Sequence, residues 1–150
     1  MTDRDPRSDL ALVVRRTIRA SAARLFEAWT TPEHLRKWWG PSASVVCPEA
    51  EVDLRVGGRY RIANRFDDGK VVWIVGEFRA VTPPHELVYT WRIEPGAMID
   101  ELVTVRFHAR GAETEVVVIH ESIATQAAKS SHEDGWDGCL DGLVRYVGDR

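Results

Sequence analysis

The spacing of apolar and polar residues changes several times along the chain. Residues 10–18 are rich in β-branched and apolar side chains, which predicts a strand. After Ser21, a residue type that caps helices, apolar residues recur at helical spacing up to Trp29. A second helical stretch begins at Pro32 and ends before Gly40. The pattern predicts one strand followed by two short helices.

From residue 43 to residue 121 the period is two, and Gly, Pro or Asp-Gly turn signals interrupt it at short intervals. This meander predicts six strands, near residues 43–54, 58–66, 71–82, 86–94, 101–109 and 113–121. Helical spacing returns after Ser130, which has the spacing of a capping box with Glu133, and continues to Val147. The last element is therefore expected to be a long, one-sided helix.

Seven antiparallel strands must bury one face, and the last helix is the one element long enough to cover it. We therefore predict an α+β helix-grip fold, a curved seven-strand antiparallel sheet wrapped around a long C-terminal helix, with two short helices after the first strand. Residues 1–9 are expected to form a flexible N-terminus, and residues 10–150 a single domain. One helix cannot fill so wide a sheet, so bulky side chains or a ligand occupy the remainder.

Alternation along each strand predicts which side chains face the helix. The inward set consists of Tyr60, Ile62, Asn64, Tyr89, Trp91, Val103, Val105, Phe107, Val116, Val118 and His120. Glu77, Glu101 and Glu121 are expected on the outer face, paired with Arg79, Arg92 or Arg106. The alternation does not place Trp73 on either face.

Composition limits the function classes. The chain has 150 residues, enough for one core, and a net charge of −3 with no basic patch, so no nucleic-acid partner is predicted. No apolar run reaches the roughly 20 residues that span a bilayer, so no membrane association is predicted. Cys47 and Cys139 lie far apart, which favours a reducing, cytoplasmic location over a disulfide framework.

Six tryptophans and a few polar side chains on the inner face are typical of a small-molecule cavity. The candidate ligand-binding residues are Trp38, Trp39, Tyr60, Asn64, Tyr89, Trp91, Phe107, His120, Trp136 and Leu140. The alternative is an ordinary core in which these polar groups bond to one another. Glycines 135, 138 and 142 in the last helix either permit a close approach of another element or form a surface stripe.

The sequence predicts no metal and no cofactor. The five histidines stand singly, without metal-ligand spacing, and no phosphate-binding glycine loop is present. The two cysteines are interpreted as small core residues. One catalytic arrangement can be built: His120 as an acid or base, assisted by Tyr60 or Tyr89.

Several segments together resemble a known family. They are FEAWTTPEHL with WWGP (residues 26–35 and 38–41), DLRVGGRYR (53–61), GEF (76–78), PPHELVYTW (83–91) and HEDGWDGCL (132–140). The chain is similar over residues 10–148 to the activator of heat-shock-protein ATPase homologue family, in the START-like (SRPBCC) superfamily. The resemblance implies a helix-grip fold with a hydrophobic cavity, and it implies no fixed catalytic set.

Three functions follow as hypotheses. The first is non-catalytic binding of a small hydrophobic or aromatic ligand, such as a lipid or polyketide, in the cavity. The second is a cyclase- or dehydratase-like enzyme that uses His120. The third is a module that binds a chaperone or another protein. The chain is expected to be a monomer or a homodimer.

Overall fold

A computed structural model describes residues 10–96 and 99–148. The predicted flexible segment, residues 1–9, lies outside the described residues. The elements are β1 (Leu10–Ile18), α1 (Ala22–Thr30), α2 (Pro32–Trp38), β2 (Ala50–Val52), β3 (Arg59–Arg65), β4 (Val71–Thr82), β5 (Glu86–Glu94), β6 (Glu101–Arg110), β7 (Glu113–Ile123) and α3 (Gln126–Gly148).

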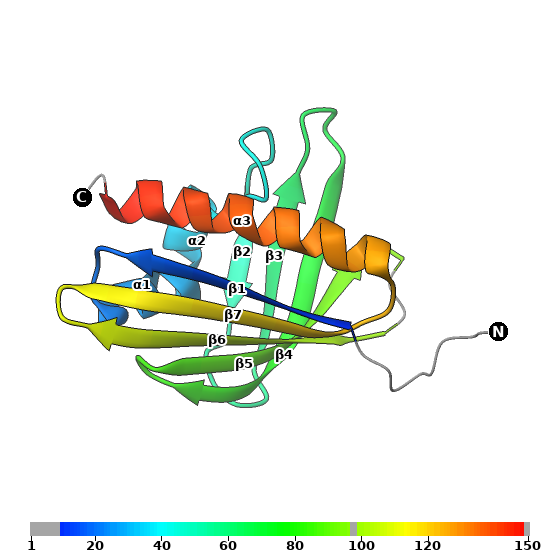
Figure 1. The fold of residues 1–150 in the computed structure, drawn as a ribbon. Helices are drawn as coiled ribbons and strands as arrows, with labels where there is room; N and C mark the ends of the chain where they lie inside the picture. The colour runs from blue at the N-terminus through cyan, green and yellow to red at the C-terminus, as the bar shows by residue number, and fades with distance from the viewer. Residues whose placement is uncertain (1–9, 97–98, 149–150) are drawn as a thin grey trace.

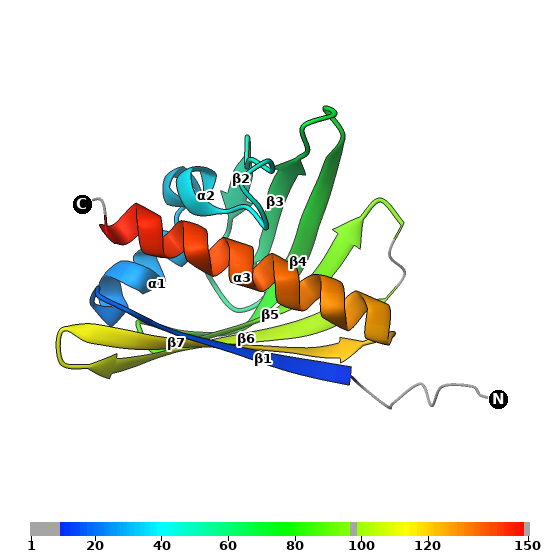
Figure 2. The same ribbon diagram turned by 45° about the horizontal axis from the view of Figure 1, so that its top comes forward.

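The seven strands form one antiparallel sheet in the order β1-β7-β6-β5-β4-β3-β2. The first strand therefore pairs with the last, from Leu10 opposite Ile123 to Ile18 opposite Thr114. The long helix α3 crosses the concave side of the curved sheet, and α2 lies beside its C-terminal half (Figures 1 and 2). The predicted α+β helix-grip fold is confirmed.

Two predicted boundaries are wrong. Of residues 43–54, only Ala50–Val52 form a strand, although Val46 makes an isolated bridge to Arg65. Pro48 lacks the N–H that a continuous ladder needs. The last helix begins at Gln126 rather than near Ser130, because the hydroxyl of Thr125 accepts a hydrogen bond from the N–H of Ala128 (3.1 Å) and caps it earlier.

The inward set predicted from alternation is buried, and all its members except the polar Asn64 and His120 belong to one hydrophobic core cluster. Trp73, which the sequence left unassigned, has the opposite parity to the buried Ile74 and is only half-buried. The guanidinium carbon of Arg61 lies 3.8 Å from the centre of its ring. Trp73 therefore belongs to the outer face and leaves the core to the other five tryptophans.

Two glycines of α3 allow the backbone after α2 to come close. A Cβ on Gly138 would lie 1.9 Å from the carbonyl oxygen of Pro41, and one on Gly142 would lie 2.5 Å from that of Trp38. A Cβ on Gly135 would meet only the Pro41 side chain, at an ordinary 3.5 Å. Of the two interpretations of the glycines, close approach therefore applies to Gly138 and Gly142.

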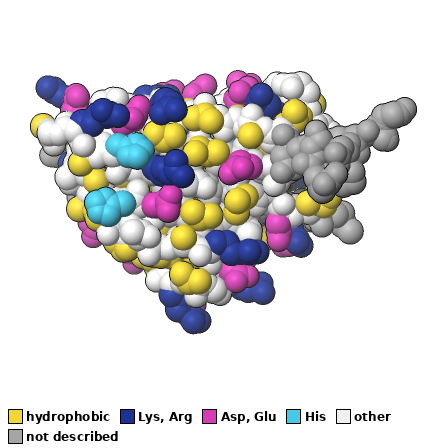
Figure 3. All heavy atoms as spheres, turned by 60° about the horizontal axis from the view of Figure 1, so that its bottom comes forward, with side chains coloured by type: hydrophobic (Ala, Val, Ile, Leu, Met, Phe, Trp, Pro, Cys, Tyr) yellow, Lys and Arg dark blue, Asp and Glu magenta, His cyan; other side chains and the backbone are white. Residues whose placement is uncertain are grey.

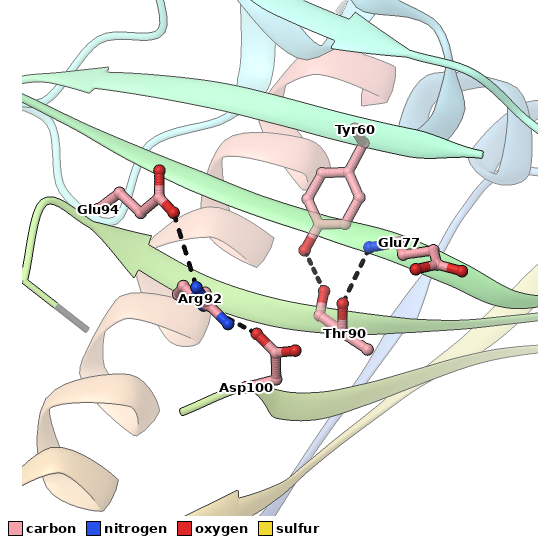
Figure 4. Close-up of polar contacts among 6 residues, drawn as sticks. All are labelled: Tyr60, Glu77, Thr90, Arg92, Glu94 and Asp100. Carbon is pink, nitrogen blue, oxygen red and sulfur yellow. Dashed lines mark hydrogen bonds and ion pairs between the residues drawn. The ribbon is translucent and has the colours of Figure 1, made fainter. Parts of the chain in front are cut away.

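The ladder between β4 and β5 is interrupted opposite Thr90, and side chains satisfy the freed backbone groups (Figure 4). The hydroxyl of Tyr60 donates to the carbonyl of Thr90 (2.6 Å), and the N–H of Glu77 donates to the hydroxyl of Thr90 (2.9 Å). The ring of Tyr60 fits because Gly76 is its cross-strand partner: a Cβ there would lie 2.7 Å from that ring. The sheet thus uses a buried tyrosine to bridge a gap.

Tyr60→Phe should lower the free energy of unfolding by about 1–2 kcal/mol, because the carbonyl of Thr90 would lose its buried partner. Urea denaturation followed by circular dichroism measures this change. A variant with wild-type stability would contradict the bridging role of the hydroxyl.

The outer face of the sheet mixes charged and apolar side chains (Figure 3). Cross-strand ion pairs include Arg106 with Glu86 (3.0 Å) and Arg110 with Glu115 (2.8 Å). The first of these differs from the expectation, which paired Arg106 with Glu77, Glu101 or Glu121. Within residues 10–96 and 99–148, no helix has the length and apolar content that crossing a membrane requires.

Candidate functional site

The concave side of the sheet has a filled half and an open half. In the filled half, next to α1, the indole N–H of Trp29 donates to the hydroxyl of Tyr89 (3.2 Å), and the ring of Tyr60 packs against that of Tyr89. The space left among these side chains is about 20 Å³, little more than one water molecule occupies. This half matches the alternative of an ordinary satisfied core.

Five tryptophans connect the two halves in a continuous aromatic cluster. Ring centres are 5.1 Å apart for Trp29 and Trp38, 5.4 Å for Trp38 and Trp39, and 5.6 Å for Trp39 and Trp136. Trp91 joins the cluster through Trp136 at 5.4 Å. The indoles come from α1, α2, β5, α3 and the residue after α2, so they hold the helices against the sheet.

The open half is a pocket of about 370 Å³ beneath the N-terminal half of α3. This volume lies in the range of roughly 300–1,000 Å³ typical of small-molecule sites. Its walls come from α3, the segment after α2, and strands β3 to β5 with the residue following β3. They are formed by Trp39, Pro41, Ser42, Val45, Asn64, Phe66, Val72, Ile74, Trp91, Ile93, Ser131, His132, Asp134, Gly135, Trp136 and Cys139.

Few polar groups interrupt the apolar walls. The amide oxygen of Asn64 accepts a hydrogen bond from the indole N–H of Trp39 (3.0 Å), which fixes the orientation of this buried amide. Among the described residues, the indole N–H of Trp91 is the one buried side-chain polar group without a hydrogen-bond partner. Burial raises the pKa of the Cys139 thiol to about 12, so this thiol is protonated at neutral pH and acts as an apolar wall.

Glu101, His120 and His132 form a cluster at one side of this pocket. Oε1 of Glu101 lies 2.7 Å from Nε2 of His120 and 3.0 Å from Nε2 of His132. The two imidazoles stack with ring centres 4.5 Å apart, and Nδ1 of His120 accepts a hydrogen bond from the indole N–H of Trp136 (3.0 Å). The prediction that Glu101 faces outward is wrong: it shares the parity of Val103 and points inward.

These contacts determine where the protons lie. An indole N–H only donates, so Nδ1 of His120 carries the lone pair and Nε2 donates to the carboxylate of Glu101. Both ring nitrogens of His120 are therefore occupied. A metal ion bound to Nε2 of His120 would place the proton of the neutral ring on Nδ1. Two N–H groups, that of Nδ1 and that of the Trp136 indole, would then face each other without an acceptor. The three side chains lie close enough to surround an ion, yet their donor pattern fits a hydrogen-bonded cluster instead.

The pKa shifts agree with this proton arrangement. Burial is the largest influence on Glu101 and would raise its pKa, but the hydrogen bonds and positive potential of the two histidines outweigh burial and lower it to about 2. Burial lowers the pKa of His120, and the neighbouring His132 adds to this effect. The cluster at neutral pH therefore pairs an ionised carboxylate with a neutral His120.

Four of the ten predicted ligand-binding residues line the open pocket: Trp39, Asn64, Trp91 and Trp136. The other six do not line it. Tyr60 and Tyr89 lie in the filled half, Trp38 borders a separate surface depression beside α3, and Phe107, His120 and Leu140 are fully buried in the core. His120, the catalytic candidate, meets the pocket through its neighbours Trp91, His132 and Trp136.

Several pocket residues were missed. His132 precedes Trp136 by four positions, so helical spacing already places both on one face of α3. Glu101 could have been found from the alternation that places Val103 and Phe107 inward. In contrast, Phe66, Val72 and Ile93 lie near or just beyond the ends of their strands. Alternation there does not predict whether an inward side chain borders a pocket or a filled core.

A curved antiparallel sheet that grips a long helix over a partly open apolar pocket defines a helix-grip protein of the START-like class. Residues 19–148 match the family model described as activator of Hsp90 ATPase homolog 1-like protein, and the chain belongs to this family. Comparison with curated protein sequences found no match.

Solved structures show the same fold. A protein from Chromobacterium violaceum is 24% identical, with a TM-score of 0.83 over 91% of this chain and 96% of that one. An AHSA1-like protein from Aeromonas hydrophila is 25% identical, with a TM-score of 0.77 over 93% of each chain. An AHSA1 protein from Silicibacter pomeroyi is 19% identical, with a TM-score of 0.83 over 93% of this chain and 98% of that one.

Proposed function

We propose that the protein binds a small, uncharged, largely aromatic ligand in the open pocket without transforming it. The observation that carries this proposal is the pocket itself, about 370 Å³ of space with indole walls beside a core that is otherwise filled. Apolar surface removed from water supplies the main driving force, and the few oriented polar groups set the position of the ligand.

Val72→Phe should weaken the binding of 2-methoxynaphthalene, a neutral two-ring probe without a hydrogen-bond donor, by about tenfold, because the larger side chain occupies pocket volume. Val71→Phe is the matched control, since Val71 is exposed and has the opposite parity on the same strand. Amide NMR titrations measure both affinities. If neither this probe nor other neutral two- and three-ring aromatics shift pocket resonances, the proposal is wrong.

An enzyme that uses His120 has less support. Both nitrogens of His120 are engaged, and its side chain does not line the pocket. Burial raises the pKa values of Tyr60 and Tyr89, so neither phenol gives up its proton readily at neutral pH. Partner binding, cytoplasmic location, a lipid or polyketide ligand and the monomeric or dimeric state remain predictions from the sequence.

A further inference from the structure

The α3 wall of the pocket carries a hydrogen-bond acceptor whose orientation the fold fixes. Nε2 of His132 lies 3.0 Å from the carboxylate of Glu101, which is ionised and can only accept. Nε2 therefore carries the proton, and in the neutral ring the lone pair lies on Nδ1. The His132 side chain is only 12% exposed, so packing as well as this contact with Glu101 restrains the ring.

Nδ1 of His132 is not buried in the protein interior. Among residues 10–96 and 99–148, this atom has no hydrogen-bond partner. Within the same residues, Nε1 of Trp91 is the one side-chain polar atom that is both buried and without a partner. Nδ1 must therefore be accessible rather than buried. His132 itself lines the pocket, so a bound molecule can approach this atom.

The charges around the pocket disfavour a charged ligand. Asp134 is exposed to solvent, and apart from His132 it is the one solvent-exposed ionisable residue on the described pocket wall. An anion would be repelled by Asp134 and by the ionised Glu101 behind His132. A cation would lose its hydration against indole walls, while Oε1 of Glu101 already contacts Nε2 of both histidines.

Resting on the proposed ligand pocket, we propose that the ligand is a neutral, planar aromatic molecule with a hydroxyl group that donates its hydrogen bond to Nδ1 of His132. Glu101 is the positioning residue that holds the acceptor lone pair in place. The pocket wall also holds one buried donor without a partner among the described residues, the indole N–H of Trp91, whose ring centre lies 6.0 Å from that of His132.

The experiment compares 2-naphthol with 2-methoxynaphthalene, which has the same rings and oxygen but no O–H. The wild-type protein should bind 2-naphthol about fivefold more tightly in NMR titrations, the value of one neutral hydrogen bond. In His132→Phe this preference should disappear, because phenylalanine has no acceptor in place of Nδ1. Ser131→Ala, which removes a neighbouring hydroxyl of the same wall, should keep the preference.

A second measurement covers the case in which His132→Phe does not fold. Imidazole nitrogen NMR of the wild-type protein should show the Nδ1 resonance of His132 shifting with 2-naphthol and not with 2-methoxynaphthalene.

Equal wild-type affinities for the two probes would overturn this inference and leave the proposed function intact. Absence of binding by both probes would overturn this inference, and the proposed function as well if other neutral two- and three-ring aromatics also fail to bind. A 2-naphthylmethylammonium ion that binds more tightly than 2-naphthol would refute the assignment to a neutral ligand.

Discussion

Gly138→Ala should lower the free energy of unfolding by about 3 kcal/mol, the upper range for overpacking a tight contact. The added Cβ would lie 1.9 Å from the backbone carbonyl oxygen of Pro41, and no side-chain rotation can move either atom away. The helix and the segment after α2 must therefore separate. Because Pro41 also forms part of the pocket wall, the same separation should change the pocket.

Gly135→Ala is the matched control, three residues earlier in the same helix. Its Cβ would make an ordinary 3.5 Å contact with the side chain of Pro41, and the better helix propensity of alanine should raise stability by up to about 1 kcal/mol. Urea denaturation of the two variants measures the difference. Equal effects of the two substitutions would show that helix propensity, rather than the approach of Pro41, governs this face of α3.

Glu101→Gln should lower the free energy of unfolding at pH 7 by about 2–3 kcal/mol. The amide would lose the negative charge that accepts hydrogen bonds from His120 and His132, both of which are largely buried. Glu113→Gln, an exposed carboxylate at the start of β7, is the control and should change stability by less than about 0.5 kcal/mol.

The stabilisation by the Glu101 carboxylate should decrease as the pH falls. The folded protein holds the pKa of Glu101 at about 2, below its ordinary 4.5, so the carboxylate stabilises the fold above pH 4.5. That contribution, about 3 kcal/mol for such a shift, is lost as the pH falls from 4.5 towards 2. The stability difference between wild type and Glu101→Gln, measured by urea denaturation at pH 7, 4.5 and 3, should shrink in this range. A constant difference would rule out the ionised carboxylate as its source.

Most of the fold could be predicted because the hydrophobic pattern of this chain is regular. Alternation placed Val103, Phe107 and His120 on the inner face, and all three are buried. Glu101 was misplaced because acidic side chains usually face water, although its parity is that of Val103. A buried carboxylate is stable only with donors, and those donors come from β7 and α3, which no local pattern connects to β6.

Whether the concave face is open could not be predicted from the same pattern. Tyr60 and Trp91 have the same inward alternation, yet one lies in the filled half and the other lines the pocket. The difference depends on how closely elements approach, as at Gly138 and Pro41, and on side-chain orientations.

The pairing of β1 with β7 also has a consequence for how the chain folds. Leu10 and Ile123 are neighbours in space although nearly the whole described chain separates them, and α3 packs on both strands. Local hairpins such as β3–β4 and β6–β7 can form early, whereas contacts between distant parts of a chain form slowly. On a ribosome, the inner face would keep its indoles uncovered until α3 emerges. The pocket would then be among the last parts of the protein to take shape.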